Sequence, residues 1–168
     1  TQGSTERYIG TWLKDQKRED LVVATKITGP NAYFNYIRPN LGFSKEVLYD
    51  ALNKSLERLQ TDYVDIYQLH WPERSVNFFG QRNYKHNPDE KWQDNFKEII
   101  EVLDGFVKEG KIRHYGVSNE SSWGVMRQVS ESKLNGLITC KTIQNPYSLL
   151  NRTFEINLAE VSLREQIG

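Results

Sequence analysis

Apolar residues along the chain recur at two different spacings, one typical of helices and the other of short buried strands. Apolar positions from Val47 to Leu59 follow the helical period, and Ser44 stands where its side chain can cap the first turn. A second stripe from Phe96 to Val107 is closed by Gly110, a residue suited to the left-handed end of a helix. Weaker stripes predict three further helices: Thr5–Leu13, Trp123–Leu134 and Phe154–Gln166.

Short apolar runs between these stripes predict four strands. The run Leu21–Lys26 stops before Gly29 and Pro30, and the β-branched and aromatic run Tyr63–His70 stops at Trp71-Pro72. The other two strands are Ile112–Val117 and Leu137–Gln144. Strands that alternate with helices indicate a parallel sheet, because parallel neighbours need a long connection. The fold class is therefore α/β.

Connections after the strands are much longer than those before them. Ile27–Phe43 and Trp71–Asp94 both follow strands, whereas Gln60–Asp62 suffices to lead from a helix into a strand. In α/β folds the loops at the carboxyl ends of the strands build the binding site. An eight-unit barrel needs about 250 residues, so the chain supplies roughly half the units. A four-stranded open sheet is the alternative, although no glycine-rich phosphate loop follows any strand.

Polar residues close all four predicted strands. They are Lys26, His70, Ser118 with Asn119, and Gln144. Any one of them could simply mark where a strand reaches solvent. Four together favour a site, because the ends of parallel strands meet at one rim and would gather an amine, an imidazole, a hydroxyl and two carboxamides there.

Composition narrows the class of protein. The 168 residues include 38% hydrophobic and 12% aromatic residues, which excludes general disorder. Twenty-two basic and 22 acidic residues cancel, so no field attracts nucleic acid or an anionic membrane. A single cysteine, Cys140, excludes a disulfide framework, and no apolar run is long enough for a membrane span. No secretion signal is visible, and we expect a cytoplasmic protein without nucleic-acid or membrane partners.

Four segments carry a family resemblance: V-V-A-T-K, D-I-Y-Q-L-H-W-P, K-I-R-x-Y-G-V-S-N and T-I-Q-N-P-Y-S-L-L-N-R. They resemble the aldo-keto reductases, and most closely the Tas-like group of that family. The resemblance covers nearly the whole chain. It implies a (β/α)8 TIM barrel that binds NADP(H) and reduces small-molecule carbonyls without a metal. The chain, 1–168, would then be a single partial domain that contains the third to sixth barrel units.

The resemblance also assigns roles to the residues at the strand ends. Lys26 matches the lysine that assists a tyrosine acid, since an ammonium nearby lowers the pKa of a phenol. His70 matches the histidine that orients and polarises the substrate carbonyl. Ser118, Asn119 and Gln144 match the residues that bind the nicotinamide carboxamide and so position the ring.

Parts of the family pattern are missing from the chain. The D-x-x-x-Y segment, which supplies the tyrosine acid and the aspartate partner of the lysine, is expected before Thr1, and the seventh and eighth units after Gly168. Tyr147 belongs to the Q-N-P-Y-S-L-L stretch, and we interpret it as a loop-packing residue. We expect the 168 residues alone to be inactive and to self-associate through unpaired sheet edges. The alternative function is a non-catalytic reductase-like module for cofactor sensing or protein contact.

The remaining candidate residues have weaker interpretations. His114 lies near the start of its strand, away from His70, and is predicted to be structural; His86 is predicted to be solvated. No histidines or carboxylates have metal-ligand spacing, so no metal site is expected. Aromatic residues crowd the two long loops, where they could wall a carbonyl pocket or pack on one another.

Overall fold

The computed structural model describes residues 2–38, 40–79, 81 and 83–168. Four parallel strands form one sheet in the order β1-β2-β3-β4. Their bounds are β1 (Ala24–Ile27), β2 (Val64–Leu69), β3 (Ile112–Ser118) and β4 (Thr142–Gln144). Every strand pairs with the next one in the chain, as in a barrel wall, and the predicted α/β class is confirmed.

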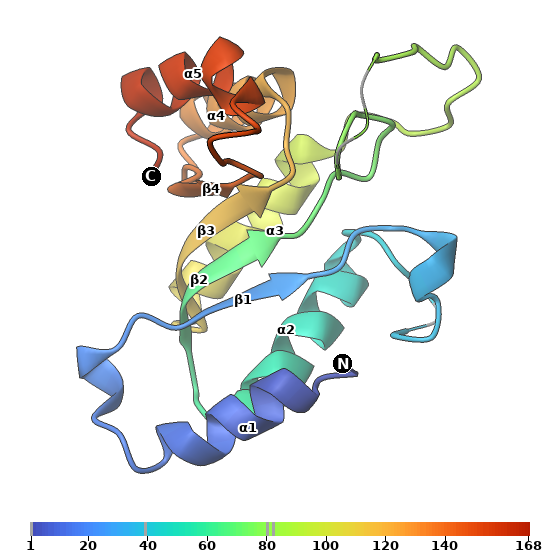
Figure 1. The fold of residues 1–168 in the computed structure, drawn as a ribbon. Helices are drawn as coiled ribbons and strands as arrows, with labels where there is room; N and C mark the ends of the chain where they lie inside the picture. Colours follow the sequence, from blue (N-terminus) through green and yellow to red (C-terminus); the bar gives the residue numbers. More distant parts are fainter. Residues whose placement is uncertain (1, 39, 80, 82) are drawn as a thin grey trace.

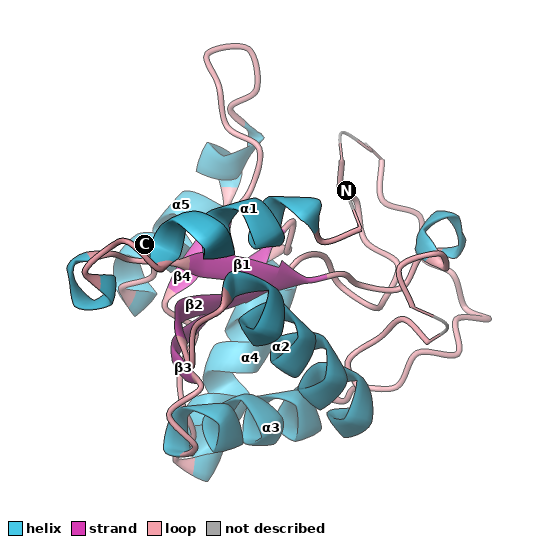
Figure 2. Cartoon of the chain, turned by 90° about the horizontal axis from the view of Figure 1, so that it is seen from below, coloured by secondary structure: helices cyan, strands magenta, loops and turns pink. Residues whose placement is uncertain are grey.

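Five α-helices connect and flank the strands: α1 (Ser4–Leu13), α2 (Lys45–Leu59), α3 (Phe96–Lys108), α4 (Ser122–Asn135) and α5 (Leu158–Glu165). Figure 1 shows α1 and α2 near β1, and α4 and α5 near β4. Each helix contacts the next one in the chain, and Figure 2 shows α2 and α3 side by side along the strands. Three short 3-10 helices lie in the connections: η1 (Arg18–Asp20), η2 (Ala32–Phe34) and η3 (Thr153–Ile156). Within the described residues, no helix has the length and apolar character needed to cross a membrane.

Two helix ends, at Ser44 and Gly110, follow the predicted chemistry, and a third, at Ser121, has a cap that was not predicted. The hydroxyl of Ser44 accepts a hydrogen bond from the amide of Val47, and Ser121 caps α4 by accepting from Gly124. Gly110, just beyond α3, has φ of 75°, the left-handed conformation that suits glycine. These residues determine where α2 and α4 begin and where α3 ends.

The two faces of the sheet differ in polarity. Tyr67 and Tyr115 are neighbours in the ladder, and both are buried in the apolar cluster that includes Leu103 and Phe106 of α3. Gln68, one position further along β2, points to the opposite face, because side chains alternate along a strand. Its amide donates to the hydroxyl of Thr142 over 3.4 Å. One face therefore holds the core against the helices, and the other carries hydrogen-bonding groups.

Three strands are shorter than the sequence predicts, and β2 lacks only the two end residues, Tyr63 and His70. β1 begins at Ala24 and not at Leu21, because the carboxylate of Asp65 takes the amide of Val23, 2.9 Å away, that would otherwise face a ladder carbonyl. β4 contains only Thr142–Gln144, because the backbone of Ile138 is bound to side chains. Its amide donates to Asp104 and its carbonyl accepts from Ser132.

The last predicted helix, Phe154–Gln166, is divided in two. A 3-10 turn over Thr153–Ile156 precedes α5, and Asn157 between them has non-helical angles (φ −137°, ψ −43°). Apolar spacing continued across this break and so concealed it. Asn157 is the residue before α5, and its side chain makes no cap hydrogen bond with the described residues.

Two mid-helix glycines make a matched test of close packing. A Cβ on Gly10 of α1 would lie 2.3 Å from the carbonyl oxygen of Arg58 in α2, whereas one on Gly105 of α3 would meet only the hydroxyl of Tyr49, at 3.7 Å. We expect Gly10→Ala to lower the free energy of unfolding by about 1–3 kcal/mol through overpacking. Gly105→Ala should raise it by up to about 1 kcal/mol through helix propensity. Urea unfolding measures both, and a shift of the same sign in the two variants would contradict the contact.

Candidate active site

All five predicted site residues lie at the carboxyl ends of the strands. Lys26 is in β1, His70 follows β2, Ser118 ends β3 and is followed by Asn119, and Gln144 ends β4. The two long loops, 28–44 and 70–95, extend beyond the arrowheads of β1 and β2 at the same rim (Figure 1). The structure thus places residues up to 118 positions apart in the chain on one rim of the sheet.

Lys26 and His70 form the first part of the site. The backbone amide of His70 donates to the carbonyl of Ile27 over 2.9 Å, which places the imidazole beside the end of β1. Burial, and next the charge of Lys26, lower the pKa of His70 below its usual value. Partial burial also lowers the pKa of Lys26, and none of the carboxylates that the structure describes lies within 4 Å of its ammonium. This part of the site therefore combines a partly buried amine with an imidazole whose neutral form is favoured.

Aromatic side chains cover one side of His70. The ring centroid of Trp71 lies 4.8 Å from that of His70, and Phe34 and Phe79 pack on Trp71 at 5.4 and 5.5 Å. The indole NH of Trp71 donates to the carbonyl of Pro30 over 3.2 Å, which ties the loop after β2 to the loop after β1. The loop aromatics thus pack on one another, as one of the two interpretations predicts, and the same cluster forms an apolar wall beside the imidazole.

Ser118, Asn119 and Gln144 form the second part of the site through direct hydrogen bonds. The hydroxyl of Ser118 donates to the carbonyl of Gln144 over 2.8 Å, and the amide of Asn119 donates to the same oxygen over 3.1 Å. The side-chain nitrogen of Asn119 donates to the carbonyl of His70 over 2.9 Å and to the hydroxyl of Ser118 over 3.1 Å. One carboxamide therefore links the ends of β2 and β3, and the carbonyl at the end of β4 is bound to the end of β3.

These bonds determine which atoms are available to a ligand. Both amide hydrogens of Asn119 and the hydroxyl hydrogen of Ser118 are used inside the protein. The side-chain oxygen Oδ1 of Asn119 accepts no hydrogen bond from any described residue, although the residue is only 8% exposed. Asn119 also lines a cavity of about 380 Å³ between the loops that follow β2, β3 and β4. The side chain of Gln144 is exposed and offers both a donor and an acceptor. The site thus presents polar atoms suited to an amide.

The backbone of Asn119 is strained. Its φ is 53°, in the left-handed region that non-glycine residues rarely adopt and that costs about 1–3 kcal/mol. Asparagine tolerates this region better than most residues. Surrounding contacts must therefore hold this residue in place.

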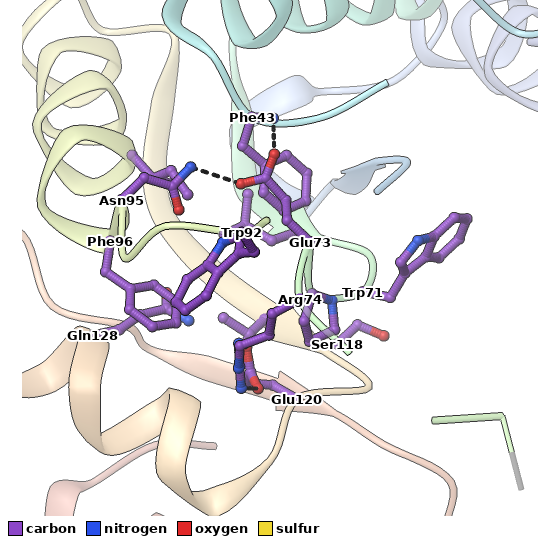
Figure 3. A pocket seen from close by; sticks show the side chains of 14 residues that line it. Phe43, Trp71, Glu73, Arg74, Trp92, Asn95, Phe96, Ser118, Glu120 and Gln128 are labelled. Atoms are coloured by element: carbon purple, nitrogen blue, oxygen red, sulfur yellow. Dashed lines mark hydrogen bonds and ion pairs between the residues drawn. The ribbon is translucent and has the colours of Figure 1, made fainter. Parts of the chain in front are cut away.

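Several neighbours of the site were not predicted from the sequence. Gln68 lies beneath it, and a buried ion pair joins Arg74 in the loop after β2 to Glu120, which directly follows Asn119 (Figure 3). Its position next to the polar Ser118-Asn119 pair was the only sequence feature that could have indicated a role for Glu120 at the site. No sequence feature indicated such a role for Arg74. Ion pairs between residues 46 positions apart are visible only in the folded chain.

The other candidate residues lie away from this rim. His114 is the third residue of β3, near the start of the strand as expected, and its side chain is exposed. His86 is exposed, as predicted. Tyr147 packs on Phe154 with a centroid distance of 6.4 Å and donates to Glu155, which fits loop packing. The described residues contain no group of three or more His, Cys, Asp or Glu side chains able to hold a metal ion.

Comparison with known proteins identifies relatives of the whole chain. The model of the Aldo/keto reductase family matches residues 1–168. Protein tas of Escherichia coli (strain K12) is 44% identical over 174 residues, covering 99% of this chain and 49% of that protein. The uncharacterized oxidoreductase YrpG of Bacillus subtilis (strain 168) is 33% identical and covers 93% of this chain and 43% of its own length.

A solved structure agrees with the sequence comparison. The thermostable aldo-keto reductase Tm1743, crystallised with the inhibitor epalrestat, has a TM-score of 0.72 and 27% identity. The match covers 97% of this chain and 48% of the chain in that structure. The chain spans about half the length of the curated relatives it matches. Its four strand and helix units are accordingly part of a reductase barrel, and the chain belongs to the aldo/keto reductase family.

Proposed function

We propose that the protein containing this chain is an NADP(H)-dependent oxidoreductase that reduces aldehydes or ketones to alcohols. The family and its oxidoreductase relatives support an oxidoreductase. The observation that carries the finer proposal is the convergence of Lys26 and His70 with the linked Ser118, Asn119 and Gln144 at one rim. An amine and an imidazole beside amide-binding groups suit carbonyl chemistry next to a nicotinamide.

The amide-binding groups fit the carboxamide of a nicotinamide. The free oxygen of Asn119 can accept from the carboxamide NH₂, and the exposed side chain of Gln144 can both donate and accept. Ser118 contributes chiefly by holding Asn119 and Gln144, since its own hydrogen is already donated. When bound, the cofactor supplies the hydride, and the protein holds the ring in position.

Lys26 and His70 would act on the carbonyl oxygen. A neutral imidazole can donate a hydrogen bond to that oxygen. Burial and the charge of Lys26 favour the neutral form of His70. The ammonium of Lys26 adds positive potential where negative charge develops, and it would lower the pKa of a neighbouring phenol that acts as the acid. The alternative function, a non-catalytic module, would keep the same cofactor contacts without turnover.

Removing the charge of Lys26 tests its catalytic role in the whole protein. We expect Lys26→Met to reduce carbonyl turnover by about 100-fold or more and to change NADPH affinity much less, because the thioether cannot stabilise a phenolate. NADPH oxidation followed at several pH values gives both the rate and the pH profile. The control is Lys54→Met, since Lys54 is an exposed residue of α2 that pairs with Asp50. Near-normal turnover with an unshifted pH profile would exclude Lys26 as the group that lowers the pKa of the acid.

Removing the carboxamide contacts tests the cofactor site. We expect Ser118→Ala combined with Asn119→Ala to weaken NADPH binding about tenfold or more and to lower turnover with it, because the ring loses its orientation. Gln144→Ala should weaken binding in the same direction, and its exposed side chain makes an effect on folding small. Fluorescence titration with NADPH measures the affinities. Unchanged affinity in both variants would show that the nicotinamide binds elsewhere.

The protonation of His70 provides a pH test. Because burial and the charge of Lys26 lower the pKa of His70 below about 6.5, the unfolded chain takes up this proton first as the pH falls. The stability that comes from neutral His70 is therefore present above about pH 6.5 and is lost as the pH falls below it. We expect Lys26→Met to raise the pKa of His70, measured by NMR titration with His70→Gln used to assign the signal. An identical titration in both proteins would show that the two side chains do not interact.

A further inference from the structure

A buried ion pair lies directly beside the residue that supplies the free carboxamide oxygen. The guanidinium of Arg74 binds both carboxylate oxygens of Glu120, with distances of 2.5 and 3.1 Å. The two residues are 7% and 5% exposed. Figure 3 shows the pair between the loop that follows β2 and the start of the loop that follows β3. The pair therefore connects two of the loops that surround the candidate site.

Aromatic rings hold the guanidinium in one place. Its central carbon lies 4.9 Å from the ring centroid of Trp123, 5.4 Å from that of Phe96 and 5.8 Å from that of Trp92. The same guanidinium donates to the hydroxyl of Ser121, the cap of α4, over 3.0 Å. Phe96 and Trp123 belong to α3 and α4, so the pair is attached to the helical layer. A buried pair is weak evidence for stability, because apolar side chains of similar size often serve as well. Its fixed geometry points to a role in positioning.

Glu120 is fixed through its backbone as well. Asn145, which directly follows Gln144, accepts from the amide of Glu120 over 3.2 Å and donates to its carbonyl over 2.8 Å. The carboxylate of Glu120 also accepts from the amide of Ser121 over 2.6 Å. Glu120 is thus held from the loop after β2, from the loop after β4 and from the first turn of α4.

This clamp acts on Asn119 because the two residues share a peptide bond. Asn119 has a left-handed φ of 53°, and the residue lines the cavity of about 380 Å³. If Glu120 were free to shift, the backbone of Asn119 could relax to an ordinary conformation. The hydrogen bond from its side chain to the carbonyl of His70 would then break, and the position of Oδ1 would change.

We propose that Arg74 and Glu120 are positioning residues that hold Asn119 in its strained conformation and so orient the nicotinamide carboxamide. This inference rests on the proposed function. Arg74 and Glu120 act through Asn119 and need not touch the cofactor. Asn145 supports the same constraint from the β4 side.

The test compares two ligands of the whole protein. NADPH carries the nicotinamide, whereas adenosine 2′,5′-bisphosphate contains only the adenosine half of the cofactor. We expect Glu120→Gln to weaken NADPH binding about tenfold, because a neutral amide cannot hold the guanidinium in the same way, and to leave adenosine 2′,5′-bisphosphate binding unchanged. Asn145→Ala should act in the same direction and leaves no buried charge unpaired. It therefore provides the test if Glu120→Gln does not fold.

A control separates positioning from general loss of stability. Asp65 at the start of β2 is also a largely buried carboxylate, paired with Arg18 at 2.8 Å and Arg113 at 3.2 Å, but it lies at the opposite end of the strands. Asp65→Asn should lower the melting temperature without changing the affinity for either ligand.

Each outcome has a separate meaning. Equal weakening of both ligands by Glu120→Gln, or unchanged NADPH binding, would overturn the positioning role. Absence of NADPH binding by the unmodified protein would instead overturn the proposed function.

Discussion

Parallel strands bring their carboxyl ends to one rim, and in this protein side-chain hydrogen bonds then hold those ends at fixed positions. The carboxamide of Asn119 spans from the carbonyl of His70 to the hydroxyl of Ser118, and that hydroxyl binds the carbonyl of Gln144. Ladder hydrogen bonds fix the register of the strands but not the loops that follow them. The geometry of the candidate site depends on this small polar network, since its members include the residues proposed to bind the cofactor.

The network has an energetic cost that the surroundings must offset. Asn119 adopts a left-handed backbone conformation, and the Arg74 and Glu120 charges are removed from water next to it. Aromatic rings from α3 and the start of α4 surround the guanidinium, so the helical layer that forms the apolar core also supports the polar rim. A left-handed residue beside a buried ion pair at the polar rim fits a functional site. The opposite end has its own ion pairs around Asp65, which tie strand starts together.

The proposed chemistry follows from how the two halves of the rim differ. Lys26 and His70 form a half that is cationic and partly desolvated, with an aromatic wall on Trp71. Asn119 and Gln144 form an uncharged half whose groups recognise amides. A carbonyl compound beside the first half and a nicotinamide beside the second would place the reacting atoms between them.

The sequence by itself determined the class of fold, the order of strands and helices, the Ser44 and Gly110 helix ends, and the set of polar residues at the strand ends. Each of these depends on local periodicity or on residue chemistry within a few positions, which a sequence displays directly. Only the tertiary structure decided where β1 and β4 begin, because Asp65 and Asp104 compete for backbone amides from distant positions. It alone showed which atoms of Ser118 and Asn119 are already used, and it alone joined Arg74 to Glu120. Such contacts link residues tens of positions apart, and no local pattern encodes which of many possible partners a side chain will meet.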